Sequence, residues 1–200
     1  MVIGVAVDGV ILDYMNTVRA YAELYDFEEL HKNGVVNKQG IKVGERYDWT
    51  KEEMKNFADK YFDFLTPKTN FNPLAVEIIN RLHDEGHKIY IISNRGLLSE
   101  KAMTLCEEMF EKQGLKIDKY FWKIDNKLPI IQQNNVEVMI DDSYNVCKST
   151  SDNNINTIYF REKDSKEIDS QFVFDVDNWG QIYRIIKQRQ NSVSRCKRML

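Results

Sequence analysis

The chain has 200 residues, of which 42% are apolar and 12% are aromatic. This composition is typical of a globular protein and excludes a disordered or collagen-like chain, and the length suits one domain with a small insert. The formal net charge is −3, from 28 basic and 31 acidic side chains. It argues against a partner that is a nucleic-acid polymer or an anionic membrane, because both select for basic surfaces.

The longest apolar run, residues 2–7, is too short to cross a bilayer and has no basic segment before it. We therefore expect neither a membrane span nor a signal peptide. The three cysteines, Cys106, Cys147 and Cys196, are odd in number and form no CxxC motif. This pattern favours free thiols in the reducing cytoplasm and argues against a zinc site.

The first 72 residues predict one strand followed by helices. The apolar run at residues 2–7 reads as a buried strand, which ends at a turn signal, Asp8 followed by Gly9. Two amphipathic helices follow. Tyr14, Val18, Tyr21 and Tyr25 are spaced as one face of the first, and the second begins after Thr50, with Glu53 completing a capping box. This pattern predicts a helical cap inserted after the first strand.

From residue 73 onward, predicted strands alternate with predicted helices. We expect strands at residues 88–92, 136–140, 155–160 and 172–175, and helices at residues 73–85, 97–112, 128–134 and 179–190. The alternation predicts an α/β fold with a Rossmann-like parallel sheet and helices on both faces. Residues 191–200 are polar and basic, and we expect them to form a flexible tail.

Polar residues stand at the ends of three predicted strands. Asp8 follows the first, Ser93 the second, and Asp141 with Asp142 the third, while Lys127 begins a short helix. Open parallel sheets bind ligands at the carboxyl ends of their strands, so we expect these side chains to share one edge. Carboxylates bind Mg²⁺, and a hydroxyl and a lysine bind phosphate. Singly, each also reads as a turn, cap or surface residue; together they predict a phosphoryl-transfer site.

These segments resemble, in order, the four motifs of the haloacid dehalogenase-like (HAD) phosphatases. Residues 2–11 resemble the first motif, residues 91–95 the second, Lys127 the third and residues 139–143 the fourth. The helical insert resembles the cap of the branch that contains the 5′(3′)-deoxyribonucleotidases and related bacterial proteins, and residues 177–183 are similar to the end of those relatives.

The resemblance implies a HAD-type core at residues 1–13 and 73–190, with the helical cap at residues 14–72. It implies a Mg²⁺-dependent, 5′-nucleotidase-like phosphatase that hydrolyses a small phosphorylated metabolite through an aspartyl-phosphate. Asp8 would be the acid/base. Ser93, Asn94, Arg95, Lys127 and Gly9 would bind the phosphate or the substrate, and the backbone carbonyl of Asp8 with Asp141 and Asp142 would bind the metal.

One residue departs from the family pattern. Ala6 stands where the family has its nucleophilic aspartate, and a methyl group neither attacks phosphorus nor binds a metal. Ala6 is then either an ordinary core residue or the trace of a nucleophile removed from an otherwise complete site. We favour the second interpretation, in which the chain is inactive or nearly so, and leave open whether the change is natural or engineered.

The substrate is less well defined by the sequence. The cap aromatics Tyr14, Tyr21, Tyr47, Trp49, Phe57 and Tyr61 would stack on a base or sugar, or would form the core of the cap itself, which we favour. Asn16, Arg46 and above all Arg95 are polar candidates to meet the substrate, and His31, His83 and His87 are assigned to the surface. Three functions stay open: a nucleotide phosphatase disabled at Ala6, a non-catalytic binding protein, and a sugar- or polyol-phosphate phosphatase.

Overall fold

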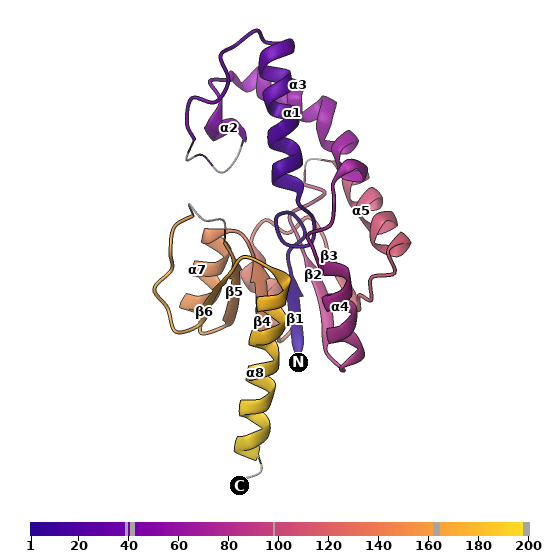
Figure 1. Cartoon of the computed structure of the whole chain (residues 1–200), viewed down its shortest axis with the longest axis vertical. Coiled ribbons are helices and arrows are strands. Elements are labelled where there is room, and N and C mark those ends of the chain that lie inside the picture. The colour runs from indigo at the N-terminus through magenta and orange to yellow at the C-terminus, as the bar shows by residue number, and fades with distance from the viewer. Residues whose placement is uncertain (39, 41–42, 98, 162–164, 198–200) are drawn as a thin grey trace.

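The computed structural model describes residues 1–38, 40, 43–97, 99–161 and 165–197, with the backbone alone for residues 191–197. One parallel sheet organises the chain (Figure 1). Its strands are β1 (Val2–Val5), β2 (Lys88–Ile92), β3 (Lys119–Phe121), β4 (Val138–Asp141), β5 (Asn156–Phe160) and β6 (Val173–Val176), in the order β3-β2-β1-β4-β5-β6. β1 is therefore central, with β2 and β4 as its neighbours.

Helices follow the strands and pack on the sheet. They are α4 (Ala75–Asp84), α5 (Glu100–Lys112), α6 (Lys127–Gln133), α7 (Tyr144–Asp152) and α8 (Trp179–Lys197). The guanidinium of Arg81 in α4 lies 4.5 Å from the ring centre of Tyr183 in α8, so these two helices are neighbours. The predicted α/β fold with a parallel, Rossmann-like sheet is confirmed. None of the described helices is long and apolar enough to cross a membrane.

The structure differs from the sequence-based expectation at the edges of the sheet. β3 was not predicted, because Lys119 and Tyr120 are exposed on an edge strand of three residues that lacks an apolar run. α7 was not delimited either. Residues 191–197 continue α8 as helix where we expected a flexible tail, since the turn-by-turn backbone hydrogen bonds of α8 extend past residue 190. Residues 198–200 lie outside the described part of the chain.

Three helices between β1 and α4 form a separate layer, which we call the cap: α1 (Tyr14–Glu28), α2 (Val43–Arg46) and α3 (Lys51–Leu65). A short 3₁₀ turn, η1 (Thr66–Lys68), leads from α3 back to the sheet. The predicted capping box is confirmed, because the Thr50 side chain accepts from the amide of Glu53 and the Glu53 side chain accepts from the amide of Thr50. Figure 1 shows the cap beyond the carboxyl ends of the strands.

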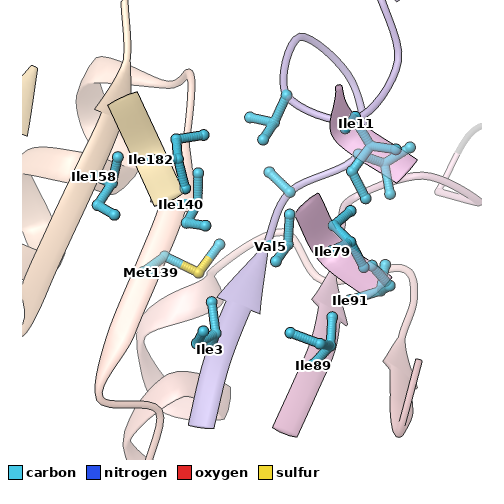
Figure 2. Packing of buried hydrophobic residues seen from close by; sticks show 14 of the residues in the cluster. Ile3, Val5, Ile11, Ile79, Ile89, Ile91, Met139, Ile140, Ile158 and Ile182 are labelled. Atoms are coloured by element: carbon cyan, nitrogen blue, oxygen red, sulfur yellow. The ribbon is translucent and has the colours of Figure 1, made fainter. Parts of the chain in front are cut away.

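Two hydrophobic clusters stabilise these two layers separately. In the sheet, Ile3 and Ile89 come from neighbouring strands, and Ile79 of α4 and Ile182 of α8 belong to the same buried cluster (Figure 2). Strands buried on both faces read as continuous apolar runs, which is why β1, β2 and β4 were predictable. The cap has its own cluster, centred on Phe57, which is fully buried. The cap therefore meets the sheet through connecting segments and a few side chains.

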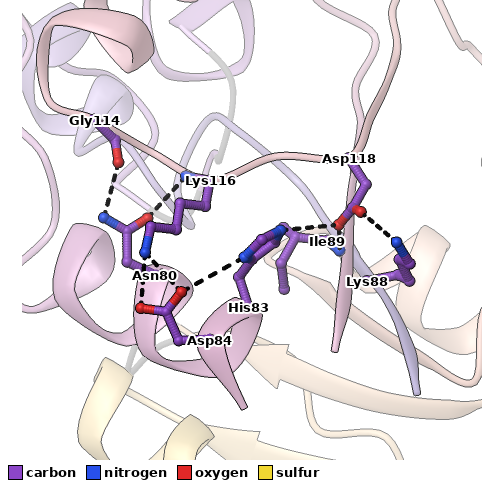
Figure 3. Close-up of polar contacts among 8 residues, drawn as sticks. All are labelled: Asn80, His83, Asp84, Lys88, Ile89, Gly114, Lys116 and Asp118. Carbon is purple, nitrogen blue, oxygen red and sulfur yellow. Dashed lines mark hydrogen bonds and ion pairs between the residues drawn. The ribbon is translucent and has the colours of Figure 1, made fainter. Parts of the chain in front are cut away.

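Polar contacts fix the amino ends of the strands, on the opposite edge from the predicted site (Figure 3). Asp118 accepts from the amide of Ile89 at 2.8 Å and from Lys88 at 2.9 Å. Lys116 donates to Asp84 at 2.6 Å, and Asn80 accepts from the amide of Lys116 at 2.8 Å. These contacts hold the segment before β3 against α4 and β2, which keeps the sheet edge rigid below the site.

Candidate functional site

A tight loop after β1 begins the site. The amides of Ile11 and Leu12 both donate to the carbonyl of Val7, at 2.9 and 3.0 Å, and the amide of Gly9 donates to Leu12 at 2.9 Å. Gly9 has a φ of +77°, which a residue without Cβ adopts at little cost. The loop therefore turns Asp8 and Gly9 across the carboxyl edge of the sheet.

Two side chains from distant segments hold this loop. The amide group of Asn72 donates to the carbonyl of Val10 at 2.8 Å, and the indole Nε1 of Trp179 donates to the same carbonyl at 2.9 Å. Sequence reasoning missed both roles. Asn72 had a usable signal, because it stands directly before Pro73 at the point where the cap region ends.

Ala6 lies at the centre of the edge. Its neighbour Val5 pairs with Ile91 of β2 and Ile140 of β4, and its amide donates to the Ile140 carbonyl at 2.9 Å. The residue is 2% exposed. The position that the family resemblance assigns to a nucleophile is thus filled by a buried methyl group, between the two strands that bring Ser93 and Asp141.

Lys127 and Asp141 form a buried ion pair at the carboxyl end of β4. Lys127 Nζ lies 2.6 Å from Asp141 Oδ2, and the amide of Ser143 donates to Asp141 Oδ1 at 2.9 Å. Each carboxylate oxygen of Asp141 therefore accepts one hydrogen bond. The structure brings these two predicted site residues together, although they come from α6 and from the end of β4.

Asp142 packs against the loop after β1. A Cβ built on Gly9 would lie 2.0 Å from Asp142 Oδ2, so the absence of a side chain at residue 9 creates the room for this carboxyl group. Burial, followed by the charge of Asp141, raises the pKa of Asp142 to about 8. Asp142 and Gly9 are thereby in direct contact, as their assignment to one site requires.

Arg95 lies on the other side of the loop and is buried, with 6% of its surface exposed. Its guanidinium forms an ion pair with Asp8, and Nη1 donates to the hydroxyl of Thr66 at 2.9 Å. Burial is the largest single effect and lowers the pKa of Arg95, but Asp8, Cys106 and Tyr14 together raise it above its ordinary value. The amide of Arg95 also donates to Ser93 Oγ at 3.1 Å, which leaves the serine O–H able to donate.

Tyr14 completes this corner. The Arg95 guanidinium carbon lies 4.7 Å from the centre of the Tyr14 ring. Burial and the nearby charge of Asp8 raise the pKa of Tyr14, so its hydroxyl stays protonated. Asn94, by contrast, is exposed on the loop after β2. We expected Arg95 to meet the substrate. The structure places its guanidinium between the core and the cap, in contact with Asp8, Thr66 and Tyr14.

The donor set determines whether the site fits a magnesium ion. Mg²⁺ in proteins takes one or two carboxylates, with water and substrate oxygens completing six ligands. Ala6 offers none, and Asp141 is engaged by Lys127 and by the amide of Ser143. Asp142 is the remaining carboxylate beside the Asp8 backbone. The described residues contain no group of three or more His, Cys, Asp or Glu able to hold a metal, so a Mg²⁺ ion here would rely on Asp142 and the Asp8 backbone carbonyl, with water and substrate oxygens as its other ligands.

A cavity of about 380 Å³ opens on the Asp142 side of the loop. Its lining mixes carboxylates, amides and guanidinium groups with two apolar side chains: Gly9, Asp13, Met15, Asn16, Arg19, Asn72, Asp142, Phe160, Arg161 and Asp177. Of the predicted site residues, Gly9 and Asp142 line it, together with Asn16, a predicted rim residue. The cavity thus connects the site to the first turns of α1 and to the ends of β5 and β6.

The cap aromatics pack on one another. Tyr47 stacks on Trp49 with ring centres 4.7 Å apart, and Trp49 contacts Phe57 at 5.2 Å. The Tyr47 hydroxyl donates to Glu23, and Trp49 Nε1 donates to Asp26, both at 2.6 Å. The expectation that these residues form the core of the cap is confirmed. The polar atoms of Tyr47 and Trp49 are thus bonded within the cap.

Two further expectations concern basic side chains. Arg46 donates to the carbonyls of Lys38 and Gly40, both at 3.1 Å, and so stabilises a loop of the cap. The assignment of His87 to the surface is wrong: it is 2% exposed and contacts Gln190 of α8 at 2.6 Å. His31 is exposed and His83 is partly exposed. The surface assignment failed for His87 because a helix 100 residues away covers it.

No family model and no curated protein sequence matches the chain. Solved structures do. A predicted phosphatase from Clostridium acetobutylicum is 11% identical with a TM-score of 0.65 and covers 94% of this chain and 98% of its own. The putative HAD-hydrolase YfnB from Bacillus subtilis, bound to magnesium, is 15% identical with a TM-score of 0.62, covering 93% and 98%. A predicted phosphoglycolate phosphatase from Haemophilus somnus is 11% identical with a TM-score of 0.62, covering 92% and 97%. The chain therefore has the α/β fold of the haloacid dehalogenase-like hydrolases.

Proposed function

We propose that the chain binds the phosphoryl group of a small phosphorylated metabolite at the carboxyl edge of its sheet, on the scaffold of a HAD-type phosphatase. One observation carries the proposal. Ser93 follows β2 and Lys127 pairs with Asp141 at the end of β4, the two strands that flank the one before buried Ala6, and a hydroxyl with an ammonium group is a common set for holding phosphate. Solved structures of this fold are named as phosphatases, which supports a small phosphorylated ligand.

Ala6 makes this site a poor catalyst in our proposal. Loss of a member of a catalytic group lowers turnover by several orders of magnitude in well-studied enzymes. The same residue limits metal binding, because an aspartate there would add an anionic ligand next to Asp142. Magnesium dependence therefore belongs to a chain with Asp at residue 6, and the present chain binds the phosphoryl group with its own cation and hydroxyl.

The cavity favours a hydroxylated leaving group over a nucleobase. Asn16 and Asn72 offer amide donors and acceptors, while Asp13 and Asp177 accept, and such a set suits the hydroxyls of a sugar, polyol or hydroxy acid. The cap aromatics that would stack on a base contact one another. A volume of about 380 Å³ is near the lower limit for ligand pockets, roughly 300 Å³. We therefore propose a sugar- or polyol-type phosphate, with a nucleotide as the competing outcome.

The test restores the nucleophile and includes a matched control. Ala6→Asp and Ala6→Asn differ by one atom type, so a shared folding defect would affect both, and circular dichroism melting checks this. Each is assayed with Mg²⁺ on nucleoside monophosphates and on sugar, polyol and hydroxy-acid phosphates. We expect Ala6→Asp to exceed Ala6→Asn by about 100-fold or more on a hydroxylated phosphate.

The outcomes separate the candidate functions. Equal rates for the two variants on every substrate would overturn the phosphatase scaffold. If the native chain still bound a phosphomonoester by calorimetry in that case, the non-catalytic binding protein would be the better description. Faster hydrolysis of nucleotides than of the hydroxylated phosphates would overturn the substrate class.

A further inference from the structure

Both connections between core and cap contact one buried side chain, Arg95. The chain enters the cap next to Tyr14 and leaves it through η1, which contains Thr66. Arg95, from the loop after β2, contacts both: its guanidinium carbon lies 4.7 Å from the Tyr14 ring centre, and Nη1 donates to Thr66 Oγ1 at 2.9 Å. The same guanidinium forms an ion pair with Asp8.

The guanidinium of Arg95 is buried, which makes the loss of any of its contacts energetically costly. The Arg95 side chain is 4% exposed and Thr66 is fully buried. Water therefore does not replace a lost partner of Arg95 or Thr66, and breaking the contact between them leaves a buried polar group without compensation, whereas the Asp8 side chain is 26% exposed. Arg95 Nε already has no hydrogen-bond partner among the described residues. The planar guanidinium thus binds two groups at the same time, the Asp8 carboxylate of the core and the Thr66 hydroxyl of the cap connection.

The two connections are also bonded to each other. The amide of Asp13 donates to the carbonyl of Asn70 at 2.9 Å, and the amide of Asn72 donates to the carbonyl of Ile11 at 2.8 Å. Because these hydrogen bonds join the two connections, exchange of the two amides reports on whether the connections stay paired beside Arg95.

We propose that Arg95 is a positioning residue that fastens both cap connections to the core and holds the Asp8 carboxylate against them. A ligand that enters beside Asp8 therefore meets a site whose cap position and whose acidic side chain are set by one guanidinium. The effect on phosphate binding rests on the proposed function, whereas the fastening of the cap does not.

The first measurement is hydrogen exchange at the amides of Asp13 and Asn72, without any ligand. Thr66→Val removes one hydrogen bond to Arg95 and should speed their exchange about two- to tenfold. In an Arg95→Met background, Thr66→Val should add nothing, because its partner is gone.

Thr69→Val is the matched control. Thr69 lies in the same connection and its hydroxyl donates to the Leu65 carbonyl at 2.9 Å, without Arg95. Its effect on exchange should be the same in the native and Arg95→Met backgrounds. If Thr66→Val leaves the two amides unchanged, or speeds them equally in both backgrounds, the proposal is overturned. Should Arg95→Met not fold, Arg95→Lys serves as the background, since a lysine has no fork with which to bond Thr66 and pair with Asp8 together.

The second measurement is the affinity for inorganic phosphate, determined by calorimetry. If Arg95 only attached the cap, Arg95→Met and Arg95→Lys would change this affinity equally. Arg95→Met leaves the Asp8 charge unpaired and should weaken phosphate binding about tenfold or more. Arg95→Lys keeps the charge beside Asp8 and should stay within about threefold of the native affinity. Equal weakening in both variants would overturn the role toward Asp8. If the native chain binds no phosphate, the proposed function fails, and the exchange cycle still decides whether Arg95 fastens the cap.

Discussion

Lys127 and Asp141 form an ion pair that is sealed from solvent: Lys127 Nζ lies 2.6 Å from Asp141 Oδ2, and the two side chains are 10% and 1% exposed. Removing two charges from water is costly, and the pair offsets this cost only while both partners are present. The amide of Ser143 satisfies the second oxygen of Asp141. The pair therefore stabilises the edge of the sheet as well as placing an ammonium group at the site.

Lys127→Met should destabilise the protein by about 3–5 kcal/mol, because it leaves the buried Asp141 carboxylate without its partner. Lys148→Met is the control: Lys148 pairs with Asp152 at 2.9 Å on the same side of the sheet, but both side chains are about half exposed. Exposed pairs of this kind contribute about 0.3–0.5 kcal/mol. Urea denaturation of both variants measures the difference, and equal losses would contradict a buried pair.

The location of the site residues at one edge of the sheet was predictable from the sequence. Buried strands in a parallel sheet read as apolar runs, and a polar residue at the end of each run marks the carboxyl edge. The sequence therefore predicts that Asp8, Ser93 and Asp141 lie at one edge of the sheet. The order of the six strands, with β1 central, required the structure, because apolar runs do not encode which strand pairs with which.

The pairing of the charges was not predictable. Arg95 and Asp8 are 87 residues apart, and the sequence around each also fits an exposed side chain. The guanidinium becomes buried because η1 and Tyr14 close over it, and neither segment carries a motif for that contact. Charged side chains that close an interface between two layers depend on the packing of both layers, which local patterns do not contain.

Gly9→Ala should lower the free energy of unfolding by more than the backbone strain of an alanine at positive φ would account for. Gly9 and Gly86 have φ values of +77° and +88°, so a Cβ strains the backbone at both, by about 1 kcal/mol. A Cβ on Gly86 meets nothing within 4 Å, whereas one on Gly9 would lie 2.0 Å from Asp142 Oδ2. Gly86→Ala is therefore the matched control for strain without a clash.

Thermal or urea unfolding of both glycine variants measures the excess. We expect Gly9→Ala to cost at least about 1 kcal/mol more than Gly86→Ala, because overpacking costs about 1–3 kcal/mol. It should also weaken inorganic phosphate binding, which Gly86→Ala leaves unchanged. Equal losses of stability would mean that the Asp142 carboxyl does not pack on the loop as described.

His87 should make the protein less stable as the pH falls below about 6.5. Burial lowers the pKa of His87 from its ordinary value of 6.5, and the N-terminal ammonium group lowers it further, while Glu85 raises it. Below pH 6.5 the unfolded chain binds a proton at His87 that the folded chain does not bind. The contribution of neutral His87 to the free energy of unfolding is therefore complete above pH 6.5 and is lost as the pH falls through the folded pKa. The slope is at most about 1.4 kcal/mol per pH unit.

His87→Gln keeps an amide beside Gln190 and removes the titration, so it should flatten the dependence of unfolding free energy on pH between 5 and 7. His31→Gln, at an exposed residue of the cap, is the control and should leave that dependence as in the native chain. Urea unfolding at several pH values measures both. An unchanged slope in His87→Gln would show that another group is responsible.

Magnesium affinity should depend on residue 6. In the native chain, Asp142 is the one carboxylate that remains next to the Asp8 backbone, since Asp141 is held by Lys127 and Ser143. Ala6→Asp adds an anionic oxygen ligand directly after β1, two residues before Asp8. We expect its Mg²⁺ dissociation constant to be at least about tenfold lower than that of the native chain, while Ala6→Asn, which is neutral, changes affinity far less.

Asp142→Asn in the Ala6→Asp background should remove this gain in Mg²⁺ affinity. Calorimetric titration with Mg²⁺ measures all four proteins, and equal affinities for the native chain and Ala6→Asp would show that residue 6 does not face the metal position.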